Sequence, residues 1–363
     1  MQKCYIVGGL GCSGKTTFAS RIGNELKIPV FHADDVHVVV AKNLEINFTD
    51  LAELVWYESW DKPKVDLKKY STVKEVFKES YLEFFNYIFP EQLIIESESL
   101  YWNDKEMEIL REVMPNHEFR FINISVDYER WVKNYSIRRR TVDYVPQFRD
   151  EHEYYRILER YESRLPKNCL TISDINNFKC SPTGGTNYQK EDFSDPKWDV
   201  FQFPEDMKGK TFMDISCNTG WFCKKASERG AKVNGLDISW QVLDIAMDRN
   251  PDGEFCLSKI EDFVPKKKYD FVLCSSAFHY YHHREDVIKK ISEMTDNFTL
   301  EAPMIDTDEE LINYQGGDDN EFCSVVSRGL LLKWLNKYFT KVIKIGETLQ
   351  PNSDNRPVYR CTK

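Results

Sequence analysis

The stretch Gly9-Leu10-Gly11-Cys12-Ser13-Gly14-Lys15-Thr16 stands between an apolar run at residues 4–7 and a helical pattern at residues 16–26. Glycines at this spacing, G-x-x-x-x-G-K-[ST], let backbone N–H groups close around phosphate oxygens, and the following helix adds its positive N-terminal end. We expect Lys15 to bridge the β- and γ-phosphates of ATP and the Thr16 hydroxyl to hold Mg²⁺. The predicted ATP contacts are Gly9, Gly11, Cys12, Ser13, Gly14, Lys15, Thr16 and Thr17.

Short apolar runs alternate with helical patterns outward from this loop, first to about residue 175 and again after Trp198. Residues 176–187, between the two series, are rich in Asn, Ser, Pro and Gly, as linkers are. Strands separated by helices predict an α/β fold with mainly parallel sheets. We expect domains at residues 1–178 and 199–363 and a linker at 179–198. The expected strands are residues 4–7, 30–32, 93–95, 119–125, 169–172, 211–215, 232–236, 269–275, 297–300, 341–345 and 358–361.

Composition and charge argue against several classes of protein. The 363 residues carry 49 basic and 59 acidic side chains, of which residues 1–178 hold 24 and 29. Neither part has the basic excess with which proteins grip long nucleic acids, so we expect no nucleic-acid partner. The ten cysteines form no C-x-x-C pair, which indicates reduced thiols. No apolar run reaches the ~18 residues of a membrane span, and the N-terminus leads into the glycine loop, so we expect a cytoplasmic protein.

Acidic residues follow two further strand candidates. Asp34 and Asp35 come just after residues 30–32, and Glu96 comes just after residues 93–95. With the glycine loop, this pattern resembles the P-loop small-molecule kinases, such as nucleoside, riboside and gluconate kinases, which have a parallel sheet with helices on both faces. The resemblance implies that Asp34 is the general base or a Mg²⁺-linked acid, with Asp35 in reserve, and that Glu96 reaches Mg²⁺ through water. The alternatives are an Asp pair that caps the next helix and a surface turn at Glu96.

The run Tyr135-Ser136-Ile137-Arg138-Arg139-Arg140 lies where these kinases carry a basic lid. Lid arginines neutralise the charge that spreads over the transferred phosphoryl oxygens. Three adjacent arginines on a helix cannot all face one ligand, and we take Arg138 and Arg139 as the candidates. The resemblance covers roughly residues 1–175 and does not name the phosphoryl acceptor.

A second motif lies at Phe212-Met213-Asp214-Ile215-Ser216-Cys217-Asn218-Thr219-Gly220. It resembles motif I of class I S-adenosylmethionine-dependent methyltransferases, D-x-G-x-G-x-G, and so implies a Rossmann-like sheet. Ser216 and Asn218 replace two of the glycines; Asn tolerates positive φ and Ser is small enough for close cofactor approach. Asp237, about twenty residues on, ends the next strand candidate, where a carboxylate accepts hydrogen bonds from ribose hydroxyls. A nicotinamide-binding domain is the alternative for these two motifs.

Two later segments favour the methyltransferase. Residues 257–263 match the adenine-contacting turn of that family, and residues 269–276 match its fourth strand, beside the transferring methyl group. Glu301 ends the next strand candidate and is expected to face the methyl acceptor. The predicted cofactor contacts are Asp214, Ser216, Cys217, Asn218, Gly220, Asp237, Ile238, Ile260, Glu261 and Ser275.

Three histidines, His279, His282 and His283, fall within five residues. No matching acidic or thiolate cluster is evident for a metal site. We expect His279 to contact the substrate or the cofactor, because members of the methyltransferase family often carry a His or an aromatic residue here beside the cofactor sulfur. Packing at a helix start is the alternative.

A kinase and a methyltransferase on one chain suggest two successive reactions. A hydroxyl is phosphorylated, and the new phosphate is then methylated. This chemistry resembles the bifunctional kinase-methyltransferases that terminate bacterial O-antigen chains, although those use a different kinase fold and the opposite domain order. We therefore predict a bifunctional transferase that uses ATP, Mg²⁺ and S-adenosylmethionine on a glycan or small-molecule acceptor, in association with glycan-assembly enzymes. The alternatives are a nucleic-acid 5′-end kinase and phosphate methyltransferase, and a regulator that binds ATP and S-adenosylmethionine without turnover.

Overall fold

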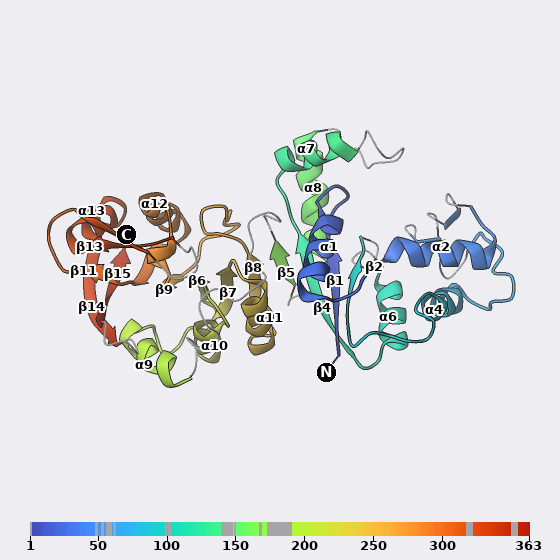
Figure 1. Cartoon of the computed structure of the whole chain (residues 1–363), viewed down its shortest axis with the longest axis horizontal. Helices are drawn as coiled ribbons and strands as arrows, with labels where there is room; N and C mark the ends of the chain where they lie inside the picture. The colour runs from blue at the N-terminus through green and yellow to red at the C-terminus, as the bar shows by residue number, and fades with distance from the viewer. Residues whose placement is uncertain are drawn as a thin grey trace. The chain divides into compact units, whose positions relative to one another are not determined.

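Figure 1 shows the computed structural model of the chain, which divides into two compact units, residues 1–175 and 176–363. The structure describes residues 2–47, 50–51, 54–55, 60, 63–98, 100, 103–138, 148, 150–166, 169–172, 191–316, 322–349 and 355–363. Both units are α/β, with mostly parallel strands. The predicted fold class is confirmed at this level.

The first unit contains a parallel sheet in the order β5-β4-β1-β3-β2. Its strands are β1 (Gln2–Gly8), β2 (Val30–His32), β3 (Gln92–Glu96), β4 (His117–Ile124) and β5 (Leu170–Ile172). Its helices include α1 (Lys15–Leu26), α2 (Ala33–Leu44), α4 (Val73–Phe84), α6 (Asp104–Val113), α7 (Tyr128–Arg138) and α8 (Glu151–Glu162).

The central strand β1 explains this arrangement. Its residues 4–7 are apolar and buried, as expected for a strand covered on both faces of a parallel sheet. Helix α1 packs closely beside β2, because a Cβ at Gly23 would come within 2.2 Å of a Val30 methyl group. From β1 the chain goes to β2 and β3 on one side and later to β4 on the other. The loop after β1 therefore lies at a topological switch point, where ligands of α/β sheets bind.

The second unit contains a sheet in the order β14-β15-β10-β9-β6-β7-β8. Strands β6 to β10 run parallel, and β15 is antiparallel to both β10 and β14. The strands are β6 (Thr211–Ile215), β7 (Lys232–Asp237), β8 (Glu254–Leu257), β9 (Phe271–Ser275), β10 (Asn297–Glu301), β14 (Lys341–Leu349) and β15 (Asn355–Thr362). A separate small sheet pairs β11 (Met304–Ile305) with β13 (Phe322–Ser327) and β13 with β12 (Ile312–Gly316). Strand β8 and this small sheet were not predicted.

Helices cover both faces of the larger sheet of the second unit. Helices α9 (Glu191–Phe201), α10 (Trp221–Glu228) and α11 (Trp240–Arg249) lie on one side, and α12 (Arg284–Met294) and α13 (Arg328–Tyr338) on the other (Figure 1). A 3₁₀ turn, η3 (Phe278–Tyr280), follows β9. None of the helices in the described part of the chain is both long and apolar enough to cross a bilayer.

Helix α9 corrects the predicted linker, because residues 191–198 are helical. Trp198 and Phe201 are buried, and their rings pack against Phe222 of α10. Pro196 and the surrounding polar residues hid this apolar face from the sequence pattern. The segment thus belongs to the core of the second unit, and the linker prediction was wrong for its last eight residues.

Arg284 fastens the turn after β9. The buried guanidinium donates from Nε to the carbonyl of Phe278 at 2.9 Å and from Nη2 to the carbonyls of His279 at 2.9 Å and Ser324 at 2.8 Å. One side chain thus joins η3 to β13.

We expect Arg284→Met to lower the free energy of unfolding of the second unit by about 3 kcal/mol, because the buried carbonyls of His279 and Ser324 lose the guanidinium that donates to them. Urea unfolding followed by circular dichroism measures this change. The control Lys333→Met removes an exposed ion pair with Glu310 and should change it by less than about 0.5 kcal/mol. An equal, small effect of both variants would show that Arg284 does not hold the turn.

Candidate functional site

The loop after β1 turns through several left-handed residues before it enters α1. Gly9, Cys12 and Gly14 all have positive φ, of 146°, 68° and 97°. A Cβ at Gly9 would come within 2.7 Å of the Ile124 carbonyl oxygen, so only glycine fits there. The loop runs directly into α1, with Gly14 as the residue that precedes the helix. The N-terminal amides of α1 and its positive end are therefore presented at this edge of the sheet.

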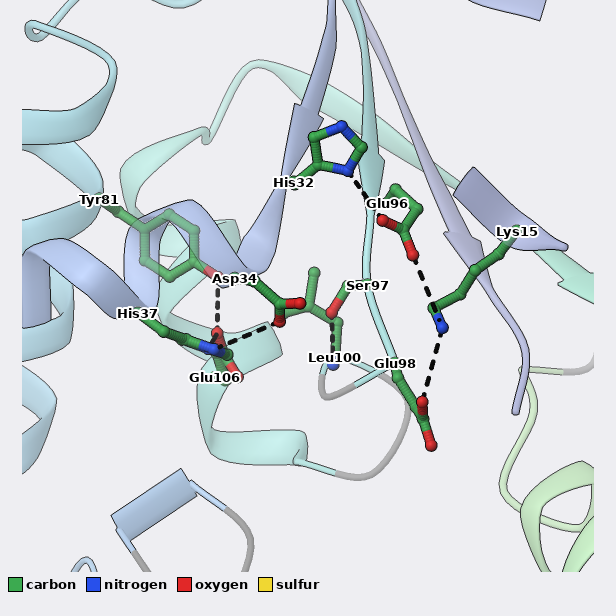
Figure 2. Close-up of polar contacts among 10 residues, drawn as sticks. All are labelled: Lys15, His32, Asp34, His37, Tyr81, Glu96, Ser97, Glu98, Leu100 and Glu106. Atoms are coloured by element: carbon green, nitrogen blue, oxygen red, sulfur yellow. Dashed lines mark hydrogen bonds and ion pairs between the residues drawn. The ribbon is translucent and has the colours of Figure 1, made fainter. Parts of the chain in front are cut away.

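Lys15 lies between two carboxylates at the same edge (Figure 2). Its Nζ is 3.7 Å from Oε1 of Glu96, at the end of β3, and 3.5 Å from Oε2 of Glu98. The other oxygen of Glu96 is 2.8 Å from Nδ1 of His32, at the end of β2. Burial raises the pKa of Glu98 above its ordinary value. The structure thus brings Lys15 and Glu96 together, and adds His32 and Glu98, which had no assigned role.

Asp34 lies in the first turn of α2 with a side chain that is 98% exposed. The residue that caps α2 is His32, and it makes no side-chain capping hydrogen bond, so the Asp pair does not cap the helix. Thr16 is exposed in the first turn of α1. The hydroxyl of Thr16 and the carboxylates of Asp34 and Glu96 are oxygen donors of the kind that Mg²⁺ prefers. No group of three or more His, Cys, Asp or Glu side chains in the described ranges is arranged to hold a metal ion.

Helix α7 contacts the loop after β1. Trp131 Nε1 donates to the carbonyl of Gly11 at 2.7 Å, and Asn134 Nδ2 donates to that of Cys12 at 2.9 Å. Arg138 is the last residue of α7, while Arg139 lies outside the described residues. The helix that leads to the predicted lid is therefore tied to the loop. Hydrogen bonds to backbone carbonyls leave no sequence signal, so neither contact was predicted.

The loop after β6 is the corresponding feature of the second unit. Ser216, Asn218 and Gly220 adopt positive φ of 59°, 48° and 70°. Only glycine fits at position 220, where a Cβ would come within 2.8 Å of the Ala246 Cβ. Between β6 and β9 the strand order reverses, so this loop also lies at a switch point of its sheet.

Asp237 ends β7 beside that loop. Its carboxylate accepts hydrogen bonds from the backbone N–H groups of Asn218 and Ser239, both at 2.9 Å. Burial raises the pKa of Asp237 to about 6. Ile238 follows directly, and Ile260 and Glu261 form a turn whose carbonyls accept from Lys290 Nζ. The predicted cofactor contacts from β6 and β7 therefore lie at one edge of the sheet.

Asp214 is a second buried carboxyl group, next to the loop after β6. Its side chain is almost fully buried, and its Oδ2 has no hydrogen-bond partner within the described part of the chain. Burial, and then the charge of Asp237, hold the pKa of Asp214 well above its ordinary value. Asp214 is therefore protonated under conditions in which an exposed Asp is ionised.

A buried ion pair lies where β9 and β10 end. Glu301, with 0% of its side chain exposed, accepts from Ser275 Oγ at 2.9 Å, Ser276 Oγ at 2.8 Å and Thr348 Oγ1 at 2.6 Å. Lys197 Nζ of α9 lies 3.3 Å from the same carboxylate. Burial acts to raise the pKa of Glu301, but Lys197 and Thr348 outweigh it and lower the pKa. Burial lowers the pKa of Lys197. Lys197 was not predicted, because it falls in the segment that was taken for a linker.

His279 lies in the turn that follows β9 and is buried, whereas His282 and His283 are exposed. Its Nδ1 has no hydrogen-bond partner among the residues that the structure describes. Burial, assisted by Arg356, lowers the pKa of His279 to about 4, so the ring is neutral near pH 7. Two residues on, Tyr281 contacts Ser216 Oγ at 2.9 Å, which joins this turn to the loop after β6.

A protein-family match covers the part of the chain that forms this edge of the sheet. The family model described as a methyltransferase domain matches residues 213–297, which run from β6 to the start of β10. Magnesium-protoporphyrin O-methyltransferase of Rhodobacter capsulatus is 44% identical over 50 residues, which cover 14% of this chain and 22% of that protein. Malonyl-[acyl-carrier protein] O-methyltransferase 1 of Ilyobacter polytropus is 29% identical over 76 residues, 20% of this chain and 28% of that protein.

A solved structure gives a similar match. Magnesium protoporphyrin IX methyltransferase from Synechocystis PCC 6803 with bound SAM has a TM-score of 0.36 and 16% identity, over 47% of this chain and 76% of that one. The chain spans about a quarter of the length of the two curated relatives that it matches.

The raised pKa of Asp214 predicts a stability effect. An Asp with a raised folded-state pKa stabilises the fold fully below the unfolded value of about 3.9, and this contribution is lost as pH rises toward the folded value. We expect Asp214→Asn to reduce the loss of unfolding free energy between pH 5 and pH 8 by about 1 kcal/mol or more. Urea unfolding at both pH values measures the difference, and the exposed Asp252→Asn is the control. Equal losses in Asp214→Asn and wild type would mean that Asp214 is ionised in the folded protein.

Proposed function

We propose that the second unit is an S-adenosylmethionine-dependent methyltransferase. The observation that carries the proposal is the methyltransferase-domain match over residues 213–297, which includes the left-handed loop after β6. In this proposal the loop receives the cofactor and Asp237 accepts hydrogen bonds from its ribose hydroxyls. Ile260 and Glu261 lie along the adenine, and Ser275 and His279 lie beside the reacting methyl group.

We propose further that the first unit is an ATP-dependent kinase. The left-handed loop after β1 and the placement of Lys15 support this reading. Lys15 would contact the β- and γ-phosphates in place of Glu96 and Glu98, because phosphate oxygens present the same negative charge. Thr16 would hold Mg²⁺, with Asp34 and Glu96 nearby, and the bound ion would neutralise phosphate charge. Asp34 would take the proton of the acceptor hydroxyl, and Arg138 and Arg139 would face the transferred phosphoryl group.

The two reactions fit one acceptor, a glycan or small molecule that first gains a phosphate and then a methyl group on that phosphate. A phosphate oxygen is anionic and attacks a sulfonium methyl without a general base, so positioning supplies most of the catalysis. The side chains near the end of β9 fit an acceptor that needs no general base. Glu301 is engaged by Lys197 and three hydroxyls, and neutral His279 is too weak a base to be charged at pH 7. We place the reaction in the cytoplasm, beside glycan-assembly enzymes.

Mass spectrometry tests the two-step scheme. The protein is incubated with ATP, Mg²⁺, S-adenosylmethionine and pooled sugars, and we expect a product that has gained one phosphoryl and one methyl group. Lys15→Ala should reduce both gains by roughly a hundredfold or more, because the phosphate contact is lost. The exposed Lys42→Ala serves as the matched control. A methyl product that persists in Lys15→Ala would separate the two activities and end the phosphate-methylation proposal.

The pKa of Asp237 predicts how cofactor binding depends on pH. Ribose hydroxyls donate to the ionised carboxylate, so affinity should be constant above about pH 7 and fall below about pH 6, by roughly tenfold per unit. Calorimetric titration with S-adenosylhomocysteine between pH 5 and pH 8 measures the change. Asp237→Asn should bind weakly at every pH, whereas Asp252→Asn should follow the wild type. Tight binding by Asp237→Asn would show that Asp237 does not contact the ribose hydroxyls.

A further inference from the structure

A lysine and a buried carboxylate form an ion pair where β10 ends in the second unit. Lys197 Nζ lies 3.3 Å from Oε1 of Glu301 and donates to Ser276 Oγ at 3.0 Å. Only 11% of the Lys197 side chain is exposed, and 0% of the Glu301 side chain. Lys197 thus balances the charge of Glu301, and any further cation beside this pair is in excess.

Arg356 of β15 supplies that further cation. Glu301 pairs with Val358 of β15, and Arg356 lies two positions before Val358, on the same face of the sheet. Thr348 of β14 lies directly opposite Arg356, at a spacing that puts their Cβ atoms about 5 Å apart. The Thr348 Oγ1 donates to Oε1 of Glu301 at 2.6 Å. The carboxylate of Glu301 therefore reaches over β15 to the pair formed by Thr348 and Arg356.

The pKa shifts of the ion pair agree with an excess cation beside it. Burial acts to raise the pKa of Glu301, but Lys197, Thr348 and Arg356 outweigh it and lower the pKa. Burial lowers the pKa of Lys197; Glu301 opposes this effect, and Arg356 adds to it. Because an arginine is effectively always protonated, two positive side chains face one negative side chain here.

Two buried nitrogen atoms of this cluster lack a hydrogen-bond partner among the residues that the structure describes. They are Nε of Arg356 and Nδ1 of His279. His279 is only 7% exposed, and after burial the charges of Arg356 and Glu301 have the largest effects on its pKa. A buried polar atom without a partner is costly, so each such atom calls for an explanation. An anionic oxygen would accept from Arg356 Nε, and from His279 in the neutral tautomer that carries the proton on Nδ1.

The place of the cluster in the sheet favours the methyl acceptor over the cofactor. Under the proposed function, the cofactor lies at Asn218 after β6 and Asp237 at the end of β7. Strand β10 lies two strands from β6 on the other side, which is about 10 Å. Ser275, the proposed neighbour of the methyl group, donates to Glu301 at 2.9 Å. The cluster therefore adjoins the reacting methyl group on the side away from the ribose contacts.

We propose that Arg356 and Lys197 hold an anionic oxygen group of the methyl acceptor, a phosphate monoester or a carboxylate, and that Glu301 fixes Lys197 in place. The proposal rests on the proposed methyltransferase function. Arginine holds two oxygens of one group through charge-assisted hydrogen bonds. Lysine has three donor hydrogens, of which Glu301 and Ser276 engage two, so a third serves the acceptor. The two cations thus select acidic acceptors over neutral ones.

NMR titration of the full chain tests the anion site. Protein saturated with S-adenosylhomocysteine is titrated with inorganic phosphate at constant pH, and the ring ¹⁵N signals of His279 are followed. Their loss in His279→Asn assigns them. We expect a saturable shift, because the anion binds beside the unpartnered Nδ1 atom. This local signal separates the site from the loop after β1, where we also expect phosphate to bind.

Variants of Arg356 identify the cation that holds the anion. Arg356→Gln should weaken phosphate binding about tenfold or more, because charge-assisted hydrogen bonds are lost. Arg356→Lys, which keeps the charge, should retain most of the affinity. Lys344→Gln is the matched control, because it removes one positive charge from the neighbouring strand β14, where Lys344 pairs with the exposed Glu347. It should bind phosphate as the wild type does.

Acetate as a second probe distinguishes the two kinds of acceptor group. Phosphate binding that is at least about tenfold tighter than acetate binding would assign a phosphate monoester, since that group carries more charge. Acetate binding as tight as phosphate binding would assign a carboxylate. Both results require that Arg356→Gln weakens the probe that binds.

The same titrations separate failure of this proposal from failure of the methyltransferase. Equal phosphate affinity in wild type and Arg356→Gln, or no saturable shift at His279, overturns the anion site, while bound S-adenosylhomocysteine leaves the methyltransferase standing. Weaker binding of S-adenosylhomocysteine itself by Arg356→Gln would show that the cations hold the carboxylate of the cofactor, which also overturns the proposal. If the wild type does not bind S-adenosylhomocysteine, the methyltransferase function falls, and the acceptor site with it.

Discussion

Both units depend on one constraint. The chain that leaves a central parallel strand, buried on both faces, must turn at the edge of the sheet where the strands have their carboxyl ends. In the first unit this strand is β1, and in the second it is β6. Each is followed by a turn with several positive φ angles that leads directly into a helix. Because the neighbouring parallel strands end at the same edge, their terminal side chains gather around that turn. Lys15 with Glu96, and Asn218 with Asp237, are the contacts that result.

Buried charge is the second common feature of the two units. Glu106 and Glu301 are fully buried, and each joins elements that are far apart in sequence: Glu106 contacts His37 and the Tyr81 hydroxyl, and Glu301 contacts Lys197 and hydroxyl donors. Such pairs cost desolvation, and their loss leaves an uncompensated charge, so they fix geometry more than they add stability. Asp214 and Asp237 are buried with no ion pair among the described residues, and burial raises the pKa of both. The protonation of the buried carboxyl groups near each candidate site therefore depends on their surroundings as well as on their residue type.

Several residues show how far sequence patterns reach. The local loop motifs predicted strand, turn and helix correctly, because glycine and small polar residues at positive φ are requirements of the backbone itself. Position 218 illustrates this, since Asn replaces a glycine and adopts the left-handed conformation. Lys197 was missed because its helix contains a proline and four acidic residues, and only the packing of Trp198 and Phe201 shows that this helix belongs to the core. Glu98 and Trp131 were missed because their partners lie far away along the chain.

The sequence by itself determined the local backbone of this protein: the glycine-containing turns at residues 9–16 and 214–220 and the strands that precede them. These features depend on neighbouring residues, so spacing alone reveals them. The tertiary structure decided which of the polar side chains act together. It left Asp34 exposed, buried Glu106 behind His37, and paired Lys197 with Glu301 across 104 positions. Burial and long-range pairing are properties of the packed fold, and no pattern along the chain encodes the distance between two side chains from different helices or strands.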